Sequence, residues 1–146
     1  MREILFRGKR VDNGDWVIGY YIKANHHWHN QGIHKDWIVV DTIQNGGWCN
    51  VRGKYAVIPE TVGQYTGLTD KNGTKIFEGD IVKVEYIGNA RGIASQIAEV
   101  VFEKCKFTLA YGWHKEIVCL TDFANVSFEV IGNIHDNPEL LKEREG

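Results

Sequence analysis

The chain has 146 residues, of which 43% are hydrophobic and 25% charged, and its net charge is -2. These values are those of a folded globular protein, so they exclude a disordered chain, a collagen and a coiled coil. A protein that holds nucleic acid on a broad basic surface usually has a positive net charge, which disfavours that class here.

Glycine and aromatic residues together predict a fold of many short strands. The chain contains 16 Gly, and aromatic residues, five Trp among them, make up 12% of it. Glycine supplies the positive φ of tight turns, and aromatic side chains suit a half-buried pleated surface. We therefore expect a mainly β protein, either all-β or β-rich α+β.

The first hairpin is expected within residues 3–22. Asn13-Gly14 lies between two apolar runs, and this dipeptide is a strong hairpin signal because both residues accept the left-handed angles of a primed turn. Apolar side chains occupy both faces of the second strand, so we expect it to be covered on both sides. These faces are formed by Trp16, Ile18, Tyr20 and Ile22 on one side and by Val17 and Tyr21 on the other.

Further strands are expected at residues 37–40 and 55–58, and Pro59 ends the second of them by removing an amide donor. The stretch between the first hairpin and residue 37 is polar and rich in His, as a loop is. These elements form a first lobe of about residues 1–59.

A second lobe is expected over about residues 60–136, resembling a small SH3-like barrel. It contains a regular strand at 81–86 and a last strand at 128–131. Between them, residues 97–102 and 107–111 predict a hairpin whose turn, 103–106, has no Gly.

A short C-terminal helix is predicted at about residues 137–144. Asn137-Pro138-Glu139 supplies an N-cap residue, a proline at the first helical position and an acid in the first turn. This is the only helix that the sequence supports.

Long stretches of the sequence resemble the YopX family. The central stretch reads TVGQYTGLTDKNG at 61–73 and IFEGDIV at 76–82. The amino end reads REILFRGK at 2–9 with GDWVIGY at 14–20, and the carboxyl end reads FEVIGNIHDNPELL at 128–141. Residues 1–146 are therefore interpreted as a single YopX-like domain, which departs most from the family pattern at residues 23–54.

The resemblance implies a small phage or prophage protein, mainly β, that acts inside a bacterial host cell. It carries over no catalytic, cofactor-binding or metal-binding residues. A cytoplasmic location agrees with two further features of the sequence. No stretch reaches the ~18 apolar residues of a membrane span, and the three cysteines, Cys49, Cys105 and Cys119, are an odd number without paired spacing.

A histidine-rich stretch is the strongest candidate for a metal site. His26, His27, His29 and His34 lie within nine residues, and Asp36 follows closely. Two imidazoles on one strand face and a third ligand would suit zinc. No Cys lies nearby and the H-E-x-x-H pattern is absent, so a solvated loop or pocket rim is favoured over a metal site.

Two acidic positions of the central stretch are also candidates for a metal site. Asp70-Lys71-Asn72-Gly73 begins like a calcium loop, but Thr74 replaces a ligand and the glycine comes too early. Asp80 follows Gly79 at the start of a strand. We expect both places to be structural, with residues 63–82 forming a turn-rich joint and Asp80 accepting hydrogen bonds from backbone amides.

These observations rank three functions. The first is a non-enzymatic, self-associating binding protein, because so many large apolar side chains in a small chain leave surface to hide between subunits. The second is a barrel that binds single-stranded nucleic acid with Arg7, Lys9, Arg10 and exposed aromatic rings. The third is a metal-dependent hydrolase that uses the four histidines. No nucleophile motif supports an enzyme, and we expect no cofactor and no membrane contact.

Overall fold

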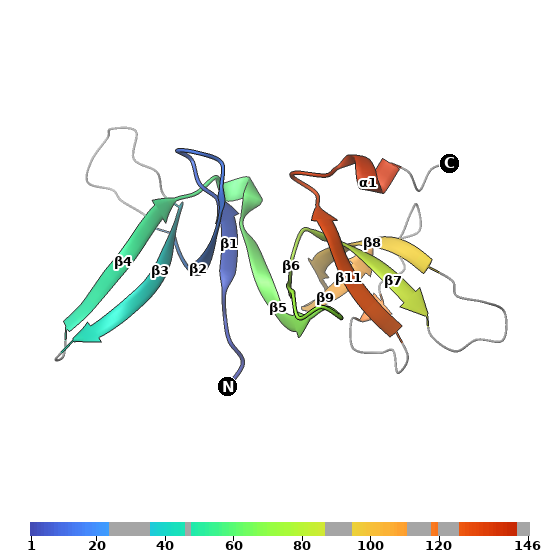
Figure 1. The fold of residues 1–146 in the computed structure, drawn as a ribbon, viewed down its shortest axis with the longest axis horizontal. Coiled ribbons are helices and arrows are strands. Elements are labelled where there is room, and N and C mark those ends of the chain that lie inside the picture. The colour runs from blue at the N-terminus through green and yellow to red at the C-terminus, as the bar shows by residue number, and fades with distance from the viewer. Residues whose placement is uncertain (24–35, 46–47, 87–94, 111–117, 120–125, 143–146) are drawn as a thin grey trace. The chain divides into compact units, whose positions relative to one another are not determined.

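The computed structural model describes residues 1–23, 36–45, 48–86, 95–110, 118–119 and 126–142 (Figure 1). Nearly all of its regular elements are antiparallel strands, which confirms the mainly β prediction. The chain divides into two compact units, Met1–Tyr65 and Thr66–Gly146. The boundary falls inside one strand of the central stretch.

The first unit is an antiparallel sheet with the strand order β4-β3-β2-β1-β5. Its elements are β1 (Phe6–Lys9), β2 (Trp16–Lys23), β3 (Asp36–Asn45), β4 (Trp48–Ala56), a 3-10 turn η1 (Pro59–Thr61) and the first part of β5 (Gly63–Thr69). Strands β1 and β2 pair so that Trp16 lies opposite Lys9, and strands β2 and β3 pair so that Ile22 lies opposite Trp37.

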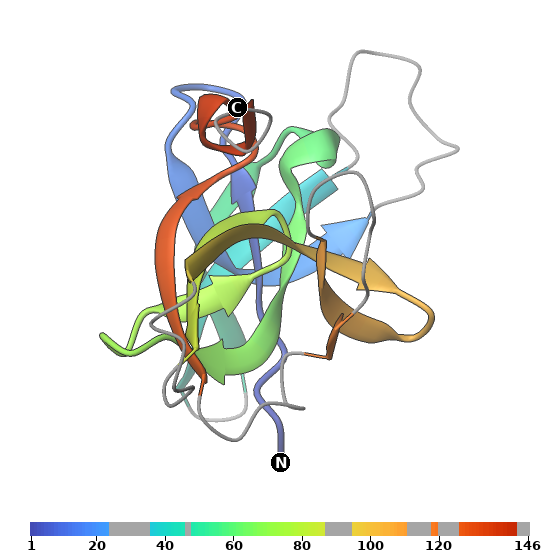
Figure 2. The same cartoon turned by 90° about the vertical axis from the view of Figure 1, so that its right-hand side faces the viewer.

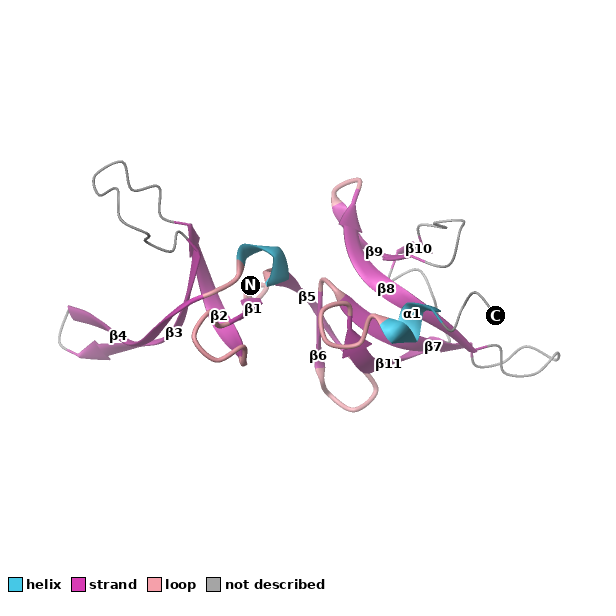
Figure 3. Ribbon diagram, turned by 90° about the horizontal axis from the view of Figure 1, so that it is seen from above, coloured by secondary structure: helices cyan, strands magenta, loops and turns pink. Residues whose placement is uncertain are grey.

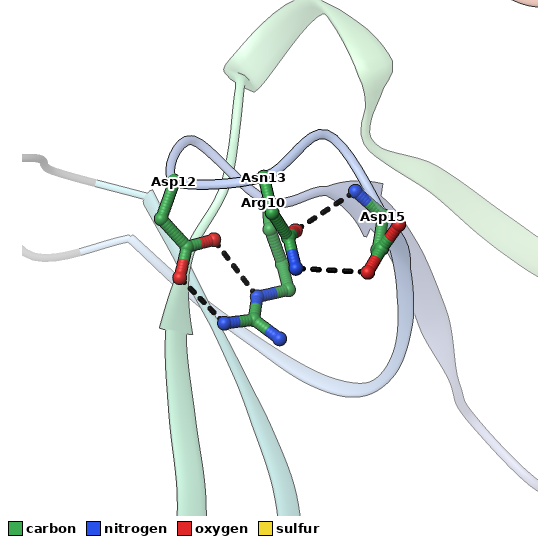
Figure 4. A network of polar contacts seen from close by, with 4 residues as sticks. All are labelled: Arg10, Asp12, Asn13 and Asp15. Atoms are coloured by element: carbon green, nitrogen blue, oxygen red, sulfur yellow. Dashed lines mark hydrogen bonds and ion pairs between the residues drawn. The ribbon is translucent and has the colours of Figure 1, made fainter.

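The predicted first hairpin is confirmed, but its turn is longer than a two-residue primed turn. Strand pairing ends at Lys9 and Trp16, and the amide of Arg10 donates to the carbonyl of Asp15 at 2.9 Å. Gly14 has a φ of +74°, whereas Asn13 keeps an ordinary negative φ. Asn13 stabilises the loop with its side chain instead, because its Oδ1 accepts the amide of Asp15 at 2.9 Å (Figure 4).

The core of the first unit lies on the side of the sheet where β1 and β2 carry glycines. Ile38 and Val57 are fully or almost fully buried there, with exposed fractions of 0% and 1%. A Cβ at Gly8 would lie 3.1 Å from Val57, and one at Gly19 would lie 2.2 Å from the carbonyl oxygen of Val39. These glycines therefore permit close approach of the backbone.

The expectation that β2 is covered on both sides is wrong. Gly19 is buried and Tyr21 half-buried on the inner face, but Ile18, Tyr20 and Ile22 on the outer face are 44%, 55% and 47% exposed. A sheet of one layer buries only one of its faces, so alternation of apolar residues on both faces does not guarantee two cover layers.

The second unit contains an antiparallel sheet with the order β10-β9-β8-β7-β11. Its elements after β5 are β6 (Lys75–Phe77), β7 (Asp80–Tyr86), β8 (Ser95–Glu103), β9 (Lys106–Ala110), β10 (Val118–Cys119), β11 (Val126–Asn133) and α1 (Glu139–Lys142). A fully buried cluster in its core is formed by Ile76, Val82, Val84, Ala98, Val100 and Leu109. The likeness to an SH3-like barrel stays a prediction.

The predicted hairpin between β8 and β9 is confirmed (Figure 2, yellow to orange). Its last pair is Glu103 with Lys106, so Lys104 and Cys105 alone form the turn, drawn as the pink tip in Figure 3. Both have a positive φ, +50° and +63°. This is the conformation of a primed turn, which glycine and asparagine adopt at lower cost.

The short C-terminal helix is also confirmed, as α1 within residues 139–142. Asn137 lies just before it, and its carbonyl oxygen accepts the amide of Leu140 at 3.1 Å. The Asn137 side chain accepts from the amide of Asn133 at 3.4 Å, which ties the start of the helix to the end of β11.

Candidate binding surface

The four histidines of the possible metal site, His26, His27, His29 and His34, lie outside the described residues. Asp36 is described, and it is 5% exposed at the start of β3. It accepts a hydrogen bond from the hydroxyl of Tyr21. Burial, together with this bond, raises the pKa of Tyr21 to about 12. No group of three His, Cys, Asp or Glu in the described part of the chain is arranged to hold a metal.

Asp70 organises the loop between β5 and β6. Its Oδ1 accepts the amides of Asn72 at 2.8 Å and Thr74 at 2.9 Å, and its Oδ2 accepts the amide of Val130 at 3.0 Å. Burial raises the pKa of Asp70, but these three bonds outweigh it, so the pKa lies below the ordinary 3.8. The structural interpretation of the calcium-like loop is confirmed by these bonds.

Asp80 is 1% exposed at the start of β7, and its Oδ2 accepts the amide of Phe77 at 2.7 Å. The predicted bond from a backbone amide is therefore present. Gly79 before it has a φ of +84°, and its amide and carbonyl bind Val100 and Ile134 across the unit at 2.8 and 2.9 Å. This part of the central stretch serves the packing of the second unit.

Of the basic residues at the end of β1, Arg10 is separate from Arg7 and Lys9, which both lie over the Trp16 ring. Arg10 binds Asp12 with two nitrogens, at 2.9 and 2.5 Å (Figure 4), and its guanidinium lies 4.2 Å from the centre of the Tyr55 ring. The hydrogen bond from Arg10 is the main cause that lowers the pKa of Asp12. Lys9, in contrast, lies beside the exposed side of β2.

We call this exposed side the β2 face. The strand register defines it, because residues directly opposite each other in an antiparallel pair point to the same side of a sheet. Its centre is Ile18, Tyr20 and Ile22, and its borders are Lys9 with Trp16 toward β1 and Trp37 with Lys54 toward β4.

Cations rest on the two tryptophans at the borders of the β2 face. The ammonium of Lys9 lies 5.5 Å and the guanidinium of Arg7 4.8 Å from the Trp16 ring centre. The ammonium of Lys54 lies 4.2 Å from that of Trp37. An aromatic ring attracts a cation over its face. The β2 face thus combines an exposed apolar centre with positive charge on both sides.

Comparison with known proteins identifies the family of the chain. The family model described as YopX protein matches residues 6–142, nearly the whole length. The chain belongs to the YopX family. No curated protein matches the sequence. A crystal structure of protein EF1440 from Enterococcus faecalis is similar, with 21% sequence identity, a TM-score of 0.58, and coverage of 97% of this chain and 99% of that one.

Membership of the YopX family and the similar crystal structure support the fold and leave the activity open. The resemblance at both ends and the centre of the sequence is confirmed by the family match. No helix in the described ranges is long and apolar enough to cross a membrane.

The β2 face is the feature that the sequence alone does not reveal. The alternation of Ile18, Tyr20 and Ile22 was visible, but the sequence does not say which of two apolar sides meets the core. Lys54 lies far along the chain, and only the pairing of β3 with β4 brings it to Trp37. The glycines at 8 and 19 were the available signal, because a strand that lacks Cβ atoms on one side packs closely on that side.

Proposed function

We propose that this YopX chain is a phage-encoded accessory protein that acts by binding, without catalysis, inside a bacterial host cell. The observation that carries the proposal is the β2 face, where three large apolar side chains are 44–55% exposed next to each other. Contiguous exposed apolar surface on a folded protein marks an interaction site more often than scattered single residues do.

The energetics also favour a binding role for the β2 face. Covering an apolar surface contributes roughly 25 cal/mol per Å², so a partner that covers the centre of this face gains affinity. Lys9 and Lys54 at its borders provide the charged rim that surrounds the apolar centre of many interfaces.

Self-association is the second part of the proposal. Phe102 at the end of β8 is 51% exposed and packs edge-on against Phe107, with their ring centres 5.0 Å apart. This aromatic pair belongs to the second unit, whereas the β2 face belongs to the first.

Light scattering at micromolar concentration tests self-association directly. We expect a molar mass of at least twice the 16.7 kDa of one chain, and a lower mass for Phe102→Ser. Lys104→Ser in the same hairpin is the matched control, because it removes an exposed side chain that is not apolar. A wild-type mass of one chain would remove self-association from the proposal.

The hydrolase alternative depends on His26, His27, His29 and His34, which lie outside the described residues. Metal analysis of protein purified without a His-tag, followed by an assay on phosphoesters, tests it. Stoichiometric zinc with turnover would replace the binding proposal, whereas substoichiometric metal without turnover would end the alternative.

A further inference from the structure

The two units of the chain differ in charge, which the net charge of the whole chain conceals. Residues 1–65 contain eight Lys and Arg against six Asp and Glu, which leaves +2. Residues 66–146 contain nine against thirteen, which leaves -4. The net charge of -2 therefore does not disfavour nucleic acid as a ligand of the first unit.

The positive charge of the first unit is present on its exposed side. Lys9 and Lys54 border the β2 face, and Arg7 lies opposite Ile18 on the same side of the sheet. Asp36, the acidic residue at the start of β3, is 5% exposed and bound to Tyr21. A ligand of complementary charge is thus an anion.

The centre of the β2 face is apolar, so its ligand must also offer a flat or apolar group. Tyr20 is 55% exposed between Ile18 and Ile22. A hollow of about 430 Å³ reaches the border of this face at Trp37 and Lys54, and the rest of its wall is Val11, Asp12, Tyr55 and Ala56. This volume is within the range of about 300–1,000 Å³ that is usual for sites of small organic groups.

We propose that the β2 face binds single-stranded nucleic acid, with a base stacked on Tyr20 and phosphates held by Lys9 and Lys54. The inference rests on the proposed function, because it names the ligand of the same face. A single strand joins anionic phosphates to flat apolar bases, and proteins bind it by combining basic side chains with exposed aromatic rings. A duplex keeps its bases stacked inside and offers Tyr20 nothing to stack on.

A second copy of this chain is the competing occupant of the β2 face. A contact between two identical faces would bring the lysines of both copies together, since each carries Lys9 and Lys54 on the same side as Tyr20. The charge complementarity therefore favours nucleic acid over a second copy.

Fluorescence anisotropy with labelled single-stranded oligonucleotides of about twenty thymidines or uridines tests the proposal on the full chain. Tyr20→Ala is expected to weaken binding about 5- to 150-fold, the range of one lost stacking contact. Tyr20→Phe keeps the ring and is expected to bind as the wild type does. A duplex of the same length is expected to bind more weakly than the single strand.

Salt dependence tests the two lysines. Lys9→Gln with Lys54→Gln should reduce the slope of log affinity against log salt by about 1.4, because each phosphate contact to a single strand contributes about 0.7. Lys104→Gln with Lys106→Gln removes two exposed lysines of the second unit and should leave the slope unchanged.

Three results would overturn the proposal. The first is a wild-type affinity for the single strand no better than millimolar at low salt. The second is an equal affinity of the wild type and Tyr20→Ala for the oligonucleotide. The third is that the wild type does not bind the oligonucleotide and that Tyr20→Ala has a lower molar mass than the wild type in light scattering. The third result would assign the β2 face to a second copy. The proposed function would survive it, because that function is contradicted only if the β2 face has no partner at all.

Discussion

Asp70 holds three backbone amides with one buried carboxylate, and this makes the stability of the second unit sensitive to acid. The pKa of Asp70 is lower in the folded chain than the ordinary 3.8. As the pH falls, this carboxylate is therefore protonated in the unfolded chain before it is protonated in the folded chain. The contribution of Asp70 is therefore complete above about pH 4 and is lost as the pH falls through the lower, folded value.

The variant Asp70→Asn is expected to lose about 1–3 kcal/mol at pH 7, because an amide oxygen replaces a charged acceptor of several hydrogen bonds. Its remaining stability should depend less on pH than that of the wild type. Urea unfolding at pH 7 and pH 3 measures both effects, with the exposed Glu60→Gln as a control. Equal acid sensitivity of Asp70→Asn and wild type would show that this carboxylate has no such role.

Gly79 and Asp80 are neighbours with different structural demands. Asp80→Asn keeps an oxygen for the amide of Phe77 and should cost at most about 1–2 kcal/mol without affecting binding. Gly79→Val should cost more, because the φ of +84° is strained for a β-branched residue, although a Cβ there has room at 3.7 Å from Ile134.

Thermal unfolding of these two variants, each with an oligonucleotide titration, checks this prediction. A variant Asp80→Asn that melts like the wild type but no longer binds would contradict the architectural role of the central stretch, which would then contain the binding site.

At the scale of elements, the β8–β9 hairpin has a turn conformation that its residues do not prefer. Lys104 and Cys105 both have a positive φ, which costs an L-residue roughly 1–2 kcal/mol. We expect Lys104→Asn with Cys105→Gly to raise the free energy of unfolding by about 1 kcal/mol, since Asn-Gly is the preferred pair for this turn. Chemical denaturation is the measurement, and a destabilised double variant would contradict the turn assignment.

The sequence predicted this hairpin from its apolar runs, although no glycine marked the turn. It predicted the first hairpin from Asn13-Gly14 as well, but the loop between Lys9 and Trp16 is set by side-chain bonds of Asn13 and Arg10 that spacing does not reveal. Period-two alternation predicts a strand, and it cannot tell a covered face from an exposed one. This is why β2 was expected to be buried on both sides.

For the whole molecule, family membership could be predicted from the sequence because long stretches of it are similar to the family pattern. The β2 face could not be predicted, because it depends on the pairing of strands that are distant in sequence. The division of charge between the units is present in the sequence, but the net charge of the whole chain conceals it. The net charge is a sum over the whole chain, whereas a ligand contacts only one side of one unit and responds to the charge there.

A binding role for the β2 face requires that its exposed side chains are not part of the core. Urea unfolding of Ile18→Thr with Ile22→Thr tests it most directly, with Ile38→Thr as the matched control, because Ile38 is fully buried on the opposite side of the same sheet. We expect the face variant to unfold within about 0.5 kcal/mol of the wild type and to bind oligonucleotide more weakly. The control should lose more than about 2 kcal/mol. A face variant as unstable as the control would show instead that the β2 face is part of the core.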